Sequence, residues 1–149
     1  MMSLSPPLVV DTSVLVAGMR PSEIYHTESR TLLEMLGHKH HSFYLPIIAL
    51  AEVAAAISRV TDNTEQAHRE VALVRQLPGL ILVPVDVTLG EQAAMIAAGY
   101  RIRGCDAVYV ALALTLNATL ITLDRQQCER SPQIVIAKTP GELLASLPR

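Results

Sequence analysis

Short aliphatic runs alternate with longer segments of helical periodicity along the whole chain. Such runs are typical of strands buried on both faces, and the longer segments place apolar residues three or four positions apart. The runs that predict strands are Leu8–Val10, Ser42–Leu45, Leu80–Val83, Thr119–Leu123 and Ile134–Ala137. The helical patterns are a stretch from the first strand to about Leu36, and then Ile47–Val60, Glu65–Leu77, Val87–Ala98, Asp106–Asn117 and Glu142–Leu147.

This alternation predicts βαβ units and therefore an α/β fold. We expect three layers, α/β/α, around a mostly parallel central sheet of about five strands. Proline and glycine fall at the predicted boundaries, as where Pro78-Gly79 separates a helix from a strand. Because no repeat, low-complexity tract or linker interrupts the pattern, residues 1–149 are expected to form a single domain.

The composition narrows the functional classes. Half of the 149 residues are apolar and 17% are charged, with a mean hydropathy of +0.34, so we expect a self-associating face. The net charge of −2 argues against a protein that coats nucleic acid nonspecifically. It leaves a nuclease open, because bound cations invert the local charge of an acidic site.

The chain carries no sign of secretion, membrane insertion or a nucleotide cofactor. Cys105 and Cys128 are too few for a zinc ligand set or a disulfide framework, and they suit a reducing compartment. The N-terminal segment lacks the basic region of a signal peptide, and no apolar run reaches membrane-spanning length. The glycines form neither a GxGxxG motif nor a Walker A loop. We therefore expect a soluble, cytoplasmic protein.

Two of the predicted strands are followed directly by an aspartate. Asp11 follows Leu8–Val10, and Asp124 follows Thr119–Leu123. Ligands of open parallel sheets bind beyond the carboxyl ends of the strands, so neighbouring strands would bring both carboxylates to one edge. An aspartate in this place more often only caps the following helix or turn, and that alternative stays open for each residue.

Glu52 lies in a predicted helix whose nearby side chains are all apolar. A buried carboxylate without a partner is costly, which favours a functional role. Its neighbours on the same helical face leave room for a cation or substrate, because they are Ile48, Ala49, Ala55 and Ala56. The alternatives are that Glu52 marks the solvated side of the helix or pairs with a distant arginine.

Asp106 opens the apolar helix predicted at 106–117. Its position suits a helix N-cap, which is the main alternative to a ligand role, and a helix N-terminus would also keep the carboxylate ionised. Carboxylates gathered in one pocket repel each other, and a divalent metal relieves that repulsion. Oxygen-only ligation suits Mg²⁺ or Mn²⁺ better than Zn²⁺. Such a metal can activate water and screen the charge of a phosphodiester under attack.

The order and context of these acids resemble the PIN domain. The nearest group is the VapC-like toxins of bacterial and archaeal toxin–antitoxin pairs, and the resemblance spans nearly the whole chain. It rests on Asp11-Thr12-Ser13 after the first strand, Glu52 in a mid-chain helix, Gly104-Cys105-Asp106-Ala107 opening an alanine-rich helix, and Thr122-Leu123-Asp124 after a strand.

The resemblance implies a Mg²⁺- or Mn²⁺-dependent endoribonuclease that is the toxin of a type II pair. It also implies an RNA substrate, a cognate antitoxin and a homodimer. The residues that resemble the family's metal-holding, catalytic acids are Asp11, Glu52, Asp106 and Asp124. Ser13 and Thr122 resemble hydroxyls that orient those acids or a water molecule. Many relatives carry a further acid after the last motif, where this chain has Arg125-Gln126-Gln127, so a second tightly held metal stays open.

Several basic residues lie near the proposed acids. Arg103 and Arg125 could contact RNA phosphates or an antitoxin carboxylate, although plain surface ion pairs are an equal alternative for them and for Arg101. His38-Lys39-His40-His41 is predicted to be a solvated turn, because a short run rarely provides the converging geometry of a metal site.

Other functional classes fit the sequence less well. A phosphatase of the haloacid-dehalogenase type would need a second aspartate two residues after Asp11, where this chain has Ser13, and a receiver domain would need an acidic pair before it. The remaining alternative is a PIN-like module that binds RNA or a partner without cutting, against which the intact acids argue.

Overall fold

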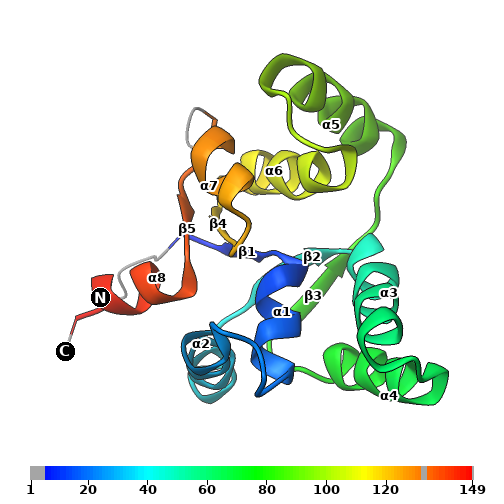
Figure 1. Ribbon diagram of the computed structural model, residues 1–149. Coiled ribbons are helices and arrows are strands. Elements are labelled where there is room, and N and C mark those ends of the chain that lie inside the picture. The colour runs from blue at the N-terminus through cyan, green and yellow to red at the C-terminus, as the bar shows by residue number, and fades with distance from the viewer. Residues whose placement is uncertain (1–5, 132–133, 149) are drawn as a thin grey trace.

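The computed structural model describes residues 6–131 and 134–148 and contains one parallel five-stranded sheet. The strand order is β3-β2-β1-β4-β5, which confirms the predicted α/β fold (Figure 1). The chain builds outward from β1 to β3 and then returns to the other side of β1, so β1 and β4 flank the point where the topology switches. The strands are β1 (Leu8–Val10), β2 (Phe43–Pro46), β3 (Leu80–Val83), β4 (Thr119–Ile121) and β5 (Ala137–Lys138).

Helices cover both faces of this sheet and complete the three expected layers (Figure 1). One face carries α1 (Thr12–Met19), α2 (His26–His38), α3 (Ile48–Thr61) and α4 (Thr64–Arg75). The other carries α5 (Val87–Tyr100), α6 (Gly104–Leu116) and α7 (Arg125–Arg130). The last helix, α8 (Pro140–Ser146), packs against α2 and β5. None of the helices described is both long and apolar enough to cross a membrane.

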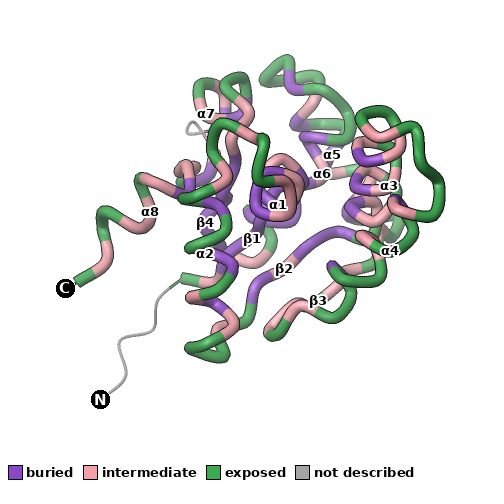
Figure 2. Tube along the Cα trace, turned by 60° about the horizontal axis from the view of Figure 1, so that its bottom comes forward, coloured by how far each residue is buried: buried purple, intermediate pink, exposed green. Residues whose placement is uncertain are grey.

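The hydrophobic core lies on both sides of the central strands. Every residue of β1 and β4 is buried, as the continuous apolar runs predict, whereas the outer strand β3 is partly exposed (Figure 2). Large buried side chains from the two helical layers fill the space above and below the sheet, and they include Leu15, Leu32, Leu36, Ile57, Tyr109 and Leu112, while Phe43 of β2 packs into the same core. The two central strands are therefore the most firmly packed part of the molecule.

The prediction of one continuous helix as far as Leu36 is wrong. The chain forms two helices there, because Arg20 ends α1 with an extended backbone and Pro21 follows it. A proline disfavours helical geometry in the residue before it and cannot donate a helical hydrogen bond. A loop therefore connects the end of α1 at Met19 to the start of α2 at His26.

The C-terminal third also differs from prediction. The strand expected at Ile134–Ala137 lies at Ala137–Lys138, because the backbone N–H groups of Ile134 and Val135 both donate to the Ser131 carbonyl at 2.9 Å and form a turn. The strand expected to run to Leu123 ends at Ile121, and the unpredicted helix α7 begins soon after it. Helix α6 begins at Gly104, two residues before the predicted start.

Gly79 is expected to be essential to the turn before β3. Its φ is +85°, and a Cβ there would lie 2.4 Å from the His41 carbonyl oxygen. Gly79→Ala should lower the free energy of unfolding by about 1–3 kcal/mol from backbone strain alone. Gly90→Ala is the control, because a Cβ there has no neighbour within 4 Å and helix α5 should gain about 0.5–1 kcal/mol. Urea denaturation that gives both variants the same stability would contradict this account.

Candidate functional site

Asp11 lies where β1 ends and α1 begins, and it is only 5% exposed. Its Oδ2 accepts three hydrogen bonds: from the Ser13 backbone N–H at 3.1 Å, the Ser13 hydroxyl at 2.6 Å and the Thr122 hydroxyl at 3.3 Å. The Gln127 side-chain amide donates to Oδ1 at 3.3 Å. Asp11 therefore caps α1, and its carboxylate is also oriented by residues from beyond the neighbouring strand.

The environment of Asp11 disfavours its negative charge. Burial raises the pKa of Asp11 above the ordinary value of 3.8. The hydrogen bonds from Ser13 and Gln127 lower it, and the nearby charge of Asp106 raises it further. A cation bound beside Asp11 would relieve both the burial cost and the repulsion.

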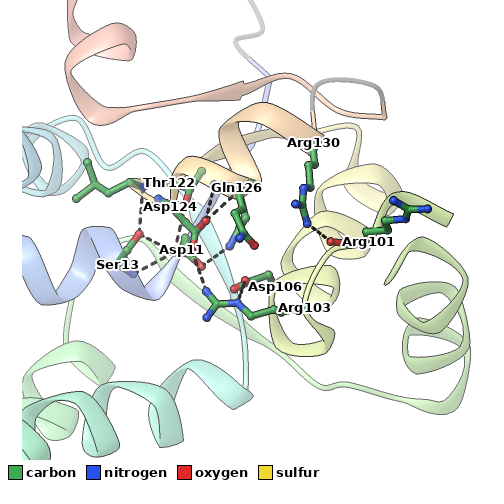
Figure 3. Close-up of polar contacts among 11 residues, drawn as sticks. Asp11, Ser13, Arg101, Arg103, Asp106, Thr122, Asp124, Gln126 and Arg130 are labelled. Atoms are coloured by element: carbon green, nitrogen blue, oxygen red, sulfur yellow. Dashed lines mark hydrogen bonds and ion pairs between the residues drawn. The ribbon is translucent and has the colours of Figure 1, made fainter. Parts of the chain in front are cut away.

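Asp124 lies at the same edge of the sheet as Asp11. Strands β1 and β4 pair in parallel with Val10 opposite Ile121, which confirms that they are neighbours. The Oδ1 atom of Asp124 caps α7 by accepting the backbone N–H groups of Gln126 at 2.8 Å and Gln127 at 3.2 Å. Its second oxygen, Oδ2, takes no part in the cap and faces Arg103 (Figure 3).

Arg103 joins Asp124 to Asp106. Its guanidinium group donates to Asp106 Oδ2 at 3.0 Å and to Asp124 Oδ2 at 2.9 Å (Figure 3). The hydrogen bond and charge of Asp106, with the charge of Asp124, raise the pKa of Arg103. The alternative that Asp106 is the N-cap of its helix is wrong: Arg103 is the N-cap of α6, and Asp106 lies in the first turn with its carboxylate held by the arginine.

Glu52, on α3, is connected to this edge through a pair of hydroxyl groups. The Tyr109 hydroxyl donates to Glu52 Oε1 at 2.7 Å, and the Thr12 hydroxyl donates to the same atom at 3.2 Å. The Thr12 hydroxyl also lies within hydrogen-bonding distance of the phenol, so its single proton is shared between Glu52 and Tyr109. Burial raises the pKa of Tyr109, and the charges of Asp11 and Glu52 add to this effect, so the phenol stays protonated as a donor. Glu52 is thus neither simply solvated nor paired with an arginine.

Three residues of this network were not identified from the sequence: Thr12, Tyr109 and Gln127. Each has a local signal, because Thr12 follows Asp11 and the other two lie three positions after Asp106 and Asp124, on the same helical faces. Gln127 is fully buried in spite of its polar side chain. A phenol in an otherwise apolar helix such as α6 can therefore mark the support of a nearby acid, whereas Gln127 lies in a polar helix where the amide gives no such signal.

The other basic residues lie outside the network. Arg125 is an exposed residue whose only described partner is Glu129, at 4.0 Å. His38 and His40 are exposed at the end of α2, and the His41 ring donates through Nδ1 to the Ser42 carbonyl. The histidine run thus forms an exposed turn, as expected.

The donor set suits a hard divalent cation. As the side chains stand within 6–131 and 134–148, no three acidic, histidine or cysteine residues converge closely enough to hold an ion, and Arg103 lies between two of the acids. The available donors are carboxylate oxygens, which Mg²⁺ and Mn²⁺ prefer. The buried amide oxygen of Gln127 has no hydrogen-bond partner although its nitrogen contacts Asp11, so an acceptor beside this acid is left unsatisfied.

The fold and the acidic edge define an α/β domain with carboxylates at the switch point of a parallel sheet. A family model of the PIN domain matches residues 8–131. The chain therefore belongs to the PIN domain family, as its motifs suggest.

Solved structures with the same fold come from several bacteria. VapC20 of Mycobacterium tuberculosis, a toxin that cleaves the sarcin-ricin loop, has a TM-score of 0.71 and 16% identity, covering 87% of this chain and 96% of its own. VapBC2 of Rickettsia felis, bound to a DNA fragment from its promoter, has a TM-score of 0.68 and 17% sequence identity, and the match covers 89% of this chain and 97% of the other. A toxin–antitoxin complex from Klebsiella pneumoniae has a TM-score of 0.65 and 18% sequence identity, and the match covers 89% of this chain and 97% of the other. No curated protein sequence matches the chain.

Replacement of Asp11 by asparagine is expected to stabilise the protein in the absence of divalent cations. The raised pKa of Asp11 means that the folded state disfavours the ionised form, so Asp11→Asn should increase the free energy of unfolding at pH 7. The gain should shrink as the pH falls and disappear below the ordinary value of 3.8, where the parent residue is protonated in both states.

Chemical denaturation in EDTA across this pH range measures the effect. Asp86→Asn is the matched control, because Asp86 is an exposed aspartate that caps α5 and asparagine caps about equally well. A loss of stability in Asp11→Asn at pH 7 would show that the folded state favours the ionised carboxylate.

Proposed function

We propose that this protein is a divalent-metal-dependent endoribonuclease and the toxin of a type II toxin–antitoxin pair. The observation that carries the proposal is the gathering of Asp11, Asp106 and Asp124 at one sheet edge in a member of the PIN domain family. Two of these acids share one arginine, and burial penalises the third. An edge that already requires positive charge is suited to hold a cation against a phosphodiester.

In this proposal, Asp11, Asp106 and Asp124 hold Mg²⁺ or Mn²⁺, and Glu52 is the fourth acid of the site. When bound, the cation would activate a water molecule and stabilise the charge that develops on the phosphodiester. Hydrolysis forms one P–O bond to the water oxygen and breaks the P–O bond to the leaving sugar oxygen, which receives the proton released by water.

The chain's own residues orient the acids for this reaction. Ser13 and Thr122 fix the Asp11 carboxylate, while Tyr109 and Thr12 fix Glu52. Such supporting hydrogen bonds hold ligands in one geometry before substrate arrives. Arg103 would leave Asp106 and Asp124 as the cation enters, and its guanidinium group would then be free to bind a phosphate oxygen.

The proposed toxin role is supported by the solved structures that share this fold. Solved relatives of the fold include a toxin–antitoxin complex from Klebsiella pneumoniae and VapBC2 of Rickettsia felis on its promoter DNA. An antitoxin would lay a helix or extended tail into the acidic cleft and place an arginine against the carboxylates, much as Arg103 does within this chain. Co-purification with the product of the adjacent gene would test the pairing, and size-exclusion chromatography would test the expected homodimer.

Family membership removes the haloacid-dehalogenase alternative. That chemistry needs a second aspartate two residues after the first, and Ser13 occupies this place with its hydroxyl bonded to Asp11. A binding module without nuclease activity remains the competing hypothesis. Cleavage assays separate it from the proposed enzyme.

Metal-dependent RNA cleavage is the central expectation. Purified protein with Mg²⁺ or Mn²⁺ should cut RNA, and EDTA should stop it. Asp106→Asn should reduce the rate on the order of a hundredfold or more, because it removes a ligand of a cation that contributes several kcal/mol to the transition state. Asp86→Asn, which changes an exposed acid away from the site, should cleave normally. Cleavage that persists in both EDTA and Asp106→Asn would falsify the proposal.

Arg103 is expected to compete with the cation for Asp106 and Asp124. Arg103→Gln should therefore tighten Mn²⁺ binding by about two- to thirtyfold, because the two ion pairs of this exposed arginine contribute about 0.2–1 kcal/mol each. Isothermal titration calorimetry measures the affinity without any reaction. Arg125→Gln removes a nearby charge that contacts none of these acids, and it should change the affinity less. Weaker Mn²⁺ binding in Arg103→Gln would mean that the arginine supports the site rather than competes for it.

A further inference from the structure

Two small clefts open beside the acidic edge and share one wall. The first has a volume of about 330 Å³ and is lined by Thr12 and Ser13, among others. The second has a volume of about 310 Å³ and is lined by Arg125, among others. Tyr25 and Leu123 line both clefts, so these two side chains separate one from the other.

The first cleft begins at the residues that orient the acids. Ser13 donates its hydroxyl to Asp11 at 2.6 Å, and Thr12 donates to Glu52 at 3.2 Å. The shared wall is tied to the same place, because the Leu123 backbone N–H donates to the Ser13 hydroxyl at 3.1 Å. A molecule whose reacting bond lay at the acids would therefore extend directly into this cleft.

Tyr25 is a half-exposed aromatic residue on a well-anchored backbone. Its side chain is 50% exposed, and it is the N-cap residue of α2, at the end of the loop that follows α1. The His26 ring is hydrogen-bonded through Nδ1 to the Ala17 carbonyl at 2.8 Å, and the Ser29 N–H donates to the Tyr25 carbonyl at 3.2 Å. An aromatic ring on an anchored backbone can offer its face to a ligand at less cost in entropy than one on a mobile loop.

The charges around the clefts indicate which part of a nucleic acid would enter. Glu23 lines the first cleft, and Glu28 lines the second together with Arg125. Carboxylates repel phosphates but accept hydrogen bonds from the N–H groups of nucleobases. Arg103 lies at the acidic edge, where the phosphate would be. The arrangement therefore suits a strand whose bases point into the clefts and whose backbone stays at the edge.

We propose that Tyr25 stacks between two consecutive unpaired bases of the RNA, with one base in each cleft. Each volume lies near the lower end of the about 300–1,000 Å³ found for small-molecule sites, which suits a single base with part of its ribose. Bases can enter only when they are unstacked and unpaired, so the substrate class is single-stranded or looped RNA. This inference rests on the proposed function, since it takes RNA as the occupant.

Equilibrium binding, separate from cleavage, tests the inference. The protein carries Asp106→Asn and is kept in EDTA so that the RNA stays intact, and a short single-stranded RNA carries a fluorescent adenine analogue at successive positions. Addition of Tyr25→Ala should weaken binding by about fivefold to a hundredfold and abolish the quenching of the analogue, because stacking on one aromatic ring contributes about that factor. Tyr25→Phe should bind like its parent, since the ring face is retained.

Matched variants separate the clefts from the surrounding surface. Ile24 is 85% exposed beside Tyr25 and lines neither cleft, so Ile24→Ala should leave binding unchanged. Ala56 lines the first cleft, and Ala56→Leu should weaken binding by filling it, whereas Ala55→Leu on the exposed face of α3 should not. The same RNA as a duplex should bind without dependence on Tyr25.

The outcomes distinguish this inference from the proposed function. If wild-type protein cuts RNA but Tyr25→Ala binds within twofold of its parent, the stacking role is wrong and the nuclease stands. If binding depends on Tyr25 while no metal supports cleavage, the nuclease is wrong and the binding clefts stand. An equal loss in Tyr25→Ala and Ile24→Ala would also overturn the inference, because it would reflect a general disturbance of the loop.

Discussion

The parallel pairing of β1 with β4 is the constraint on which the acidic edge depends. The backbone N–H of Asp11 donates to the Ile121 carbonyl at 2.8 Å, so Asp11 still belongs to the hydrogen-bond ladder although β1 ends at Val10. The Thr122 N–H in turn donates to the Lys138 carbonyl at 3.0 Å, which ties β4 to β5 at the same level. Main-chain bonds in the most buried part of the sheet thus place the first acid and the hydroxyl that orients it, and mobile loops are not required for the task.

Several acids at one edge destabilise the folded state, and hydrogen-bond donors of the same chain offset part of this cost. Hydrogen bonds from Ser13, Thr122 and Gln127 surround Asp11, and Arg103 neutralises part of the charge of its two partners. The compensation is incomplete, because the pKa of Asp11 stays raised. Sites that are ready for a ligand often retain such a deficit, which the ligand then removes. The competition between stability and function is therefore concentrated in one aspartate at the end of the central strand.

The sequence predicts those features that depend on local chemistry. Continuous apolar runs identify the strands, and an aspartate at the end of two runs identifies the edge where the acids gather. The sequence does not predict features that depend on partners brought together only by folding. Whether Asp106 caps its helix or binds an arginine is decided by Arg103 and by Asp124, eighteen residues further on. The partner of Glu52 is a tyrosine that resembles ordinary core until the fold brings it close. The short helix α7 lacks the length for a periodic pattern, and its start depends on the Asp124 cap.

The two oxygens of Asp124 have separate duties: one caps α7, and the other faces the arginine at the acidic edge. An asparagine in its place would keep an oxygen for the cap but would present an NH2 group to Arg103, which cannot accept the hydrogen bond of the arginine. A single substitution can therefore change the charge of the acidic edge without removing the cap of α7. An asparagine that still begins a helix at this position would therefore mark an edge whose charge has changed while its fold has stayed the same.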